Sequence, residues 1–259
     1  MIDNLQIDTI NKIAEYEQKS IQFIKEGMQN GSIAIMFRGK TGTGIGKGLK
    51  TKINVNIGTS SGHCNPDEEI KKAEIAEQFG ADTITDLSTA GDITDIRRSI
   101  RDVTSLPITT VPLYQAVSEN TLDFLTDDLI MDTLKNQLQE DISSMVLHCP
   151  SLHTIKAMKQ NHRIMGIVSK GGAMMASYMI KNSNENPYIS NFDEILEMFK
   201  SKNVVLSLGN TMRSGCIHDV ADKAQALEVD ENIRLAHKAH EKGVQVIIEG
   251  AGGHIRADK

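Results

Sequence analysis

The feature that most constrains the fold is a repeated order of segments along the chain. Short β-branched apolar runs end in polar or glycine-containing turns, and charged segments with helical spacing follow them. Parallel strands need crossover connections, so this order predicts a parallel sheet whose strands are joined by helices. A doubly wound sheet and a TIM-type barrel both satisfy the pattern. The predicted strands cover residues 53–57, 83–87, 108–113, 145–148, 165–168, 204–208 and 244–248.

Polar side chains gather at the ends of these predicted strands. Asn54 and Asn56 lie in the first strand, His148 ends the fourth, Asn210 follows the sixth and Glu249 follows the seventh. In an α/β barrel the loops after the strands build the active site. The pattern therefore favours an α/β fold of TIM-barrel type with one site at one rim.

Two further segments complete the predicted organisation. Residues 4–28 have a helical pattern and are expected to pack on the outside or the floor of the barrel. Residues 39–48 are glycine-rich and are interpreted as a loop, because the phosphate-binding pattern GxxxxGKS/T fails at both Lys40 and Lys47. We place a helical leader and glycine-rich loop at 1–50 and a (βα) barrel domain at 51–259. With eleven residues after position 248, we expect a barrel without its eighth strand, incomplete or closed by another segment.

Composition narrows the classes of partner. The chain has 28 Lys and Arg against 34 Asp and Glu, so it lacks the basic stripe that nucleic acid or an anionic membrane surface requires. No apolar run has the length of a membrane span, and the first 18 residues lack the apolar core of a signal peptide. Cys64, Cys149 and Cys216 are widely spaced, which fits a reduced, cytoplasmic compartment. A small-molecule partner is favoured.

In sequence order, the strand-end segments resemble motifs of the phosphomethylpyrimidine synthase family of thiamine biosynthesis, the ThiC family. The matching segments are 44–49, 52–58, 80–83, 86–89, 110–116, 185–188, 206–209 and 244–250. The resemblance implies a TIM-barrel radical-SAM lyase that rearranges aminoimidazole ribotide into hydroxymethylpyrimidine phosphate. It further implies S-adenosylmethionine and a 4Fe-4S cluster as cofactors, with a divalent metal as an additional candidate.

Carried over position by position, the resemblance implies a set of substrate-binding residues and leaves the catalytic residues unassigned. Ser169, Lys170 and Gly171 match the family's SRG and would bind the phosphate. His254 is the candidate metal ligand, displaced by one residue from the family's EGPGH pattern. Thr85 replaces a Met, Lys170 an Arg and Asn210 an Asp of the family's motifs. The complete substrate-binding set is Asn54, Asn56, Thr85, Tyr114, His148, Ser169, Lys170, Gly171, Asn210, Thr211, Met212, Arg213 and Glu249.

The family's CxxCxxxxC cluster motif is missing from these 259 residues, and the three cysteines lack its spacing. We therefore expect this chain alone to be inactive, as a fragment, a reduced paralogue or one subunit of a split enzyme. The expected partners are a ribotide and either a second copy or a chain that completes the barrel. A non-catalytic ribotide-binding paralogue and a hydroxybenzimidazole synthase-like enzyme are the alternatives. The segment 225–242 has the pattern of an ordinary amphipathic helix.

Overall fold

The computed structural model describes residues 4–160 and 162–250. Its helices are α1 (Asn4–Glu17), α2 (Ile21–Gln29), α3 (Pro66–Gln78), α4 (Ile93–Val103), α5 (Pro112–Phe124), α6 (Asp127–Gln137), α7 (Leu152–Gln160), α8 (Lys170–Asn182), α9 (Pro187–Ser190), α10 (Phe192–Lys202) and α11 (Lys223–Glu241). Its strands are β1 (Ile33–Arg38), β2 (Thr41–Gly46), β3 (Asn54–Ile57), β4 (Thr83–Asp86), β5 (Ile108–Thr110), β6 (Ser144–Leu147), β7 (Val205–Leu208) and β8 (Val246–Ile248). A short 3-10 helix spans Ile217–Asp219.

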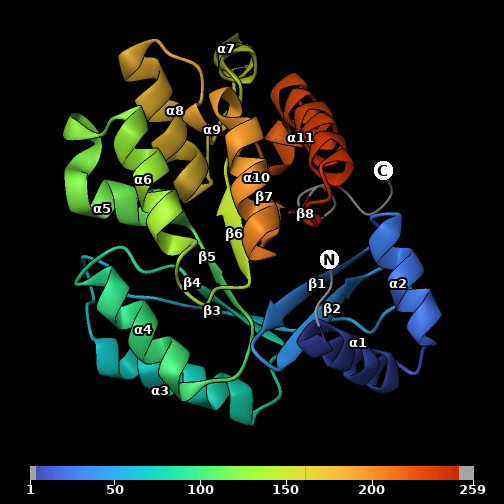
Figure 1. Cartoon of the computed structure of the whole chain (residues 1–259). Helices are drawn as coiled ribbons and strands as arrows, with labels where there is room; N and C mark the ends of the chain where they lie inside the picture. Colours follow the sequence, from blue (N-terminus) through green and yellow to red (C-terminus); the bar gives the residue numbers. More distant parts are fainter. Residues whose placement is uncertain (1–3, 161, 251–259) are drawn as a thin grey trace.

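The six strands β3 to β8 form one parallel sheet in which spatial order equals sequence order. Each strand is connected to the next through one or more helices, so the predicted α/β architecture with a parallel sheet is confirmed. Figure 1 shows the strands at the centre, the connecting helices along the left and top, and α1, α2, β1 and β2 together at the lower right. This repeat brings the carboxyl ends of successive strands to one edge of the sheet.

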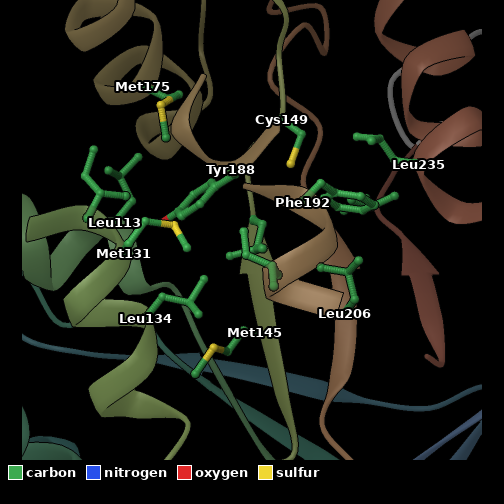
Figure 2. Packing of buried hydrophobic residues seen from close by; sticks show 14 of the residues in the cluster. Leu113, Met131, Leu134, Met145, Cys149, Met175, Tyr188, Phe192, Leu206 and Leu235 are labelled. Carbon is green, nitrogen blue, oxygen red and sulfur yellow. The ribbon is translucent and has the colours of Figure 1, made fainter. Parts of the chain in front are cut away.

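The register of the strands places different rows of side chains on the two faces of the sheet. On the outer face Ile84, Met145 and Leu206 pack under the helices, and Figure 2 shows Met145 and Leu206 among the buried side chains of that core. On the inner face, strand register places a polar row side by side: Asn56, Thr85, Thr109 and Ser144. The inner layers of a TIM barrel are usually filled with bulky branched residues. Here the row is polar from β3 to β6 and becomes apolar at Val205 of β7.

The glycine-rich segment predicted as a loop is a strand, which corrects that prediction. Residues 41–46 form β2, which pairs antiparallel with β1. A Cβ at Gly42 would lie 2.8 Å from Cγ2 of Thr9, and one at Gly44 would lie 3.0 Å from Cγ2 of Ile13. The glycines therefore allow α1 to lie directly on the hairpin, a reason that no strand propensity reveals.

The β1–β2 hairpin, which we call the floor hairpin, lies across the amino ends of the parallel strands. Ala34 and Met36 pack against Val205 of β7. The N–H of Ile35 donates to Oε1 of Gln245, just before β8, at 2.8 Å. Thr43 donates to the carbonyl of Asp82, just before β4, at 2.9 Å. With α1 and α2 packed on its other side, the predicted helical leader covers the floor.

The predicted strand at 165–168 is absent, because β6 and β7 pair directly from Ser144–Val205 to Leu147–Leu208 and leave no place between them. The N–H groups of Ile164 and Met165 donate instead to the carboxylate of Asp219, at 3.0 and 2.9 Å. Gly166 has a φ of 59°, which breaks an extended conformation. At the start of this apolar run, the backbone N–H groups are thus bonded to a side chain rather than to a neighbouring strand.

Within the described residues the sheet is open. β3 pairs with β4 alone and β8 with β7 alone, so each has one free edge and no closed barrel is present in this part of the chain. Exposed apolar side chains flank both edges: Ile53, Ile75 and Phe79 beside β3, and Ile233 and Ile248 beside β8. The boundary proposed at residue 50 stays a prediction. None of the helices in residues 4–160 and 162–250 has the length and apolar character needed to cross a membrane.

Candidate functional site

His148 follows β6 directly, and its ring lies between two glycines. A Cβ at Gly171 would lie 2.4 Å from its Cε1, and a Cβ at Gly209 would lie 2.9 Å from its Cδ2. The side chain is buried, and Nδ1 has no hydrogen-bond partner. Burial, and after it the positive charge of Arg213, lower the pKa of His148 to about 4. At neutral pH the site therefore holds an uncharged imidazole.

Tyr114 and Lys170 meet on the next side of the site. Tyr114 lies in the first turn of α5, after β5, and its hydroxyl accepts a hydrogen bond from the N–H of Gly171. The ammonium of Lys170 lies 5.3 Å from the centre of the Tyr114 ring and donates to Oγ1 of Thr89 at 3.1 Å. Burial raises the pKa of Tyr114, so its phenol stays protonated. A cation and a neutral hydroxyl thus stand side by side at the start of α8.

The ends of β7 and β8 are tied together by polar contacts. Glu249 follows β8, and its Oε1 accepts a hydrogen bond from Oγ of Ser207 at 3.1 Å. Asn210 donates from Nδ2 to the carbonyl of Gly250 at 3.0 Å, and its own carbonyl accepts from Nη1 of Arg213 at 3.2 Å. Burial raises the pKa of Glu249, opposed by the Ser207 hydrogen bond and by the charge of Arg213.

Arg213 is the common neighbour of these groups. Its charge acts on Tyr114, His148 and Glu249, each of which follows a different strand. We call Tyr114, His148, Arg213 and Glu249 the strand-end cluster. The structure therefore brings together four predicted site residues from the ends of β5, β6, β7 and β8, as a barrel-type rim requires.

Asn54, Asn56 and Thr85 form a second group on the inner face. Oδ1 of Asn54 accepts from Oγ1 of Thr83 and from Oγ1 of Thr85, both at 2.9 Å. Nδ2 of Asn54 donates to Oδ1 of Asn56 at 2.8 Å. Both asparagines are exposed beside the free edge of β3, so their remaining polar atoms are accessible. Strand register places this group on the face that carries Ser144, Val146 and His148.

Three of the predicted residues serve the backbone or the core. Ser169 caps α8, since its Oγ accepts from the N–H of Gly172 at 3.2 Å. Thr211 is fully buried, and a Cβ at Gly172 would lie 2.5 Å from its Cγ2. Met212 packs in the core between sheet and helices. Their side chains are outside the strand-end cluster, although their backbone shapes the loops that carry it.

Sequence reasoning missed Ser207 and Glu228 as parts of the site. Ser207 alternates with apolar residues along β7, which marks the inner face of the strand. Glu228 is a buried acid on α11, and Asn232 lies one turn further along the same buried face. An acid and an amide at i and i+4 on the apolar face of a helix were the available sequence indication, but the helix was interpreted as ordinary.

The described residues do not fit an iron–sulfur cluster. They contain no group of three or more His, Cys, Asp or Glu side chains that could hold a metal ion. Cys64 is exposed, whereas Cys149 is buried in the core, where burial raises the pKa of its thiol. His254, the predicted metal ligand, lies outside the described residues.

Fold and site together define an α/β protein whose strand ends present cations, an uncharged imidazole and an acidic side chain at one edge of the sheet. Residues 3–259 match the Radical SAM ThiC family, and the chain belongs to this family. It is 40% identical over 260 residues to the phosphomethylpyrimidine synthase of Methanococcus aeolicus, which covers 96% of this chain and 61% of that protein. The phosphomethylpyrimidine synthase of Methanoregula boonei is 41% identical over 262 residues, covering 97% and 61%. This chain thus spans about 61% of the length of these relatives.

Proposed function

We propose that this chain forms the substrate-binding part, on a barrel-type fold, of a phosphomethylpyrimidine synthase of thiamine biosynthesis. In this proposal it holds aminoimidazole ribotide during a radical-SAM rearrangement to hydroxymethylpyrimidine phosphate. The observation that carries the proposal is the strand-end cluster, because four groups of complementary chemistry follow four neighbouring strands inside the segment that matches the family. The polar inner row on the same sheet supports the same function.

The chemistry of the cluster suits a phosphorylated ligand rich in nitrogen. Lys170 and Arg213 supply positive charge, and Arg213 has donors beyond the one bound to Asn210. Within the SRG-like segment, the N–H of Gly171 is bonded to Tyr114 and the N–H of Gly172 to Ser169. We therefore assign the phosphate to the side chains of Lys170 and Arg213 before the helix N–H groups. Glu249 offers an acceptor for a ligand amine, and neutral His148 offers a hydrogen bond to the ring.

The cofactors and the partner belong to the same proposal. S-adenosylmethionine and a 4Fe-4S cluster would supply the radical. The cysteine motif for the cluster is absent from these 259 residues, so we assign the cluster to other polypeptide. This chain's own residues would bind, orient and shield the ribotide. Further polypeptide, from a second copy or another chain, is proposed to cover the free edges of β3 and β8. A binding-only paralogue would share the same site, so binding is the first property to test.

The test is calorimetric titration of the chain with aminoimidazole ribotide, with ribose 5-phosphate as the ligand that lacks the ring. We expect ribotide to bind more tightly than ribose 5-phosphate. Arg213→Ala should weaken ribotide binding roughly 10- to 100-fold, since hydrogen bonds to charged groups contribute about 1.5–3 kcal/mol. Arg98→Ala is the matched control, because Arg98 is an exposed arginine paired with Asp95 on α4. No heat with ribotide, or equal affinity of Arg213→Ala and the unchanged chain, would contradict the proposal.

A further inference from the structure

Glu228 places a buried carboxylate against the backbone of the loop that follows β7. Its Oε1 accepts from the N–H of Thr211 at 2.7 Å, and its Oε2 accepts from the N–H of Met212 at 2.6 Å. The next residue along the chain is Arg213. Because β7 ends at Leu208, these N–H groups have no strand partner and depend on a side chain. Both oxygens of one carboxylate are thus used to fix two consecutive peptide groups.

The same loop is held by a second side chain of α11 and by an arginine from another loop. Asn232 donates from Nδ2 to the carbonyl of Gly209 at 3.3 Å. Arg163, which is itself bonded to Asp222, donates from Nη2 to the carbonyl of Met212 at 2.6 Å. The backbone on both sides of Asn210 is therefore fixed by hydrogen bonds to its N–H and C=O groups. These hydrogen bonds restrict the position of the Cα atom of Arg213.

A carboxylate at this depth is costly, because burial removes its charge from water. Glu228 is 1% exposed, and burial raises its pKa to about 7 against the lowering effect of the two N–H donors and of Arg163. An apolar side chain here would fill the core but would leave both loop N–H groups without an acceptor. The acid is therefore needed for the hydrogen bonds of the loop, whereas an apolar residue would serve the packing of the core equally well.

We infer that Glu228 is a positioning residue that acts on the ligand site through Arg213. Glu228 fixes the backbone of Thr211 and Met212, and this backbone directs the guanidinium of Arg213 towards His148, Tyr114 and Glu249. The inference rests on the proposed function for its effect on binding, whereas the contact between Glu228 and the loop can be tested without any ligand.

The first arm of the experiment compares Glu228→Gln with the unchanged chain by amide hydrogen exchange. Glutamine has nearly the same shape, but it offers one acceptor and one donor, so one loop N–H loses its partner. We expect the amides of Thr211 and Met212 to exchange at least tenfold faster, with unchanged far-UV circular dichroism. Glu241→Gln is the matched control, an exposed acid at the end of the same helix. Unchanged exchange at both amides would overturn the inference.

The second arm is a double-mutant cycle on the affinity for aminoimidazole ribotide. If Glu228 acts through Arg213, Glu228→Gln should weaken binding roughly tenfold in the unchanged chain and less than twofold in the Arg213→Ala background. A merely structural role would give equal losses in both backgrounds, and this outcome would overturn the inference. If Glu228→Gln does not fold, Asn232→Ala replaces it in the same cycle. Absence of ribotide binding to the unchanged chain would refute the proposed function, while the exchange arm still decides the loop contact.

Discussion

Replacing Gly171 by alanine gives a sharp test of how His148 is held. Within a helix this exchange normally stabilises by about 1 kcal/mol, because alanine has the higher helix propensity. Here the new Cβ would lie 2.4 Å from Cε1 and 2.6 Å from Nδ1 of His148. The ring has little room to retreat, since Gly209 lies close to its Cδ2 edge. The gain in helix propensity and the steric overlap therefore change the free energy of unfolding in opposite directions.

The magnitude follows from the two opposing effects. Overpacking a tight site costs about 1–3 kcal/mol, and subtracting the helix gain of about 1 kcal/mol leaves a net loss of roughly 0–2 kcal/mol. We expect the free energy of unfolding of Gly171→Ala to fall by about 1 kcal/mol. The assay is urea unfolding followed by far-UV circular dichroism, with the His148 ring resonances recorded by NMR in the folded state.

The control for this experiment is Gly62→Ala, because a Cβ at Gly62 meets no atom within 4 Å. We expect its free energy of unfolding to change by less than about 0.5 kcal/mol. A Gly171→Ala variant that is more stable than the unchanged chain, with unshifted His148 resonances, would refute the steric argument. It would mean that the imidazole is not confined between α8 and the end of β7.

Two further outcomes are expected. In the folded state His148 has a pKa of about 4, against an ordinary value of 6.5. The free energy of unfolding should therefore be highest above pH 6.5 and fall by roughly 3 kcal/mol as the pH drops towards 4. Urea unfolding between these pH values should show this decrease, and His148→Gln should make it smaller. Arg97 is buried and bonds both oxygens of Glu140, so Arg97→Met should lower the free energy of unfolding by about 3 kcal/mol in the same assay. The control Arg98→Met, on the exposed side of α4, should change it by less than about 1 kcal/mol.

Periodicity located most of the sheet because each parallel strand is a short apolar run between turns. It failed where the deciding contact is distant in sequence. Residues 165–168 have the composition of a strand, yet the N–H groups of Ile164 and Met165 are bonded to Asp219, some 50 positions away. The predicted strand at 108–113 ends at Thr110, because Pro112 occupies the first turn of α5 and has no N–H to donate.

The residues of the strand-end cluster could be predicted from the sequence, because each of them follows a strand. Which of them lie close to one another could not be predicted. That Arg213 neighbours His148, Tyr114 and Glu249 depends on strand register and on the path of the loop after β7. Glu228 supports that loop from a helix that begins ten residues beyond Arg213, and its local indication is limited to its spacing of four residues from Asn232 on the buried face of that helix. Predicting such a residue requires the packing of α11 against the sheet.

The floor hairpin has a consequence for the rigidity of the described sheet. One short, hydrogen-bonded ribbon is fastened near the start of β4 through Thr43 and near the start of β8 through Gln245. The amino ends of these two strands, which lie towards opposite sides of the described sheet, are therefore held at one separation. Movement of one side of this sheet relative to the other would have to break one of these two hydrogen bonds.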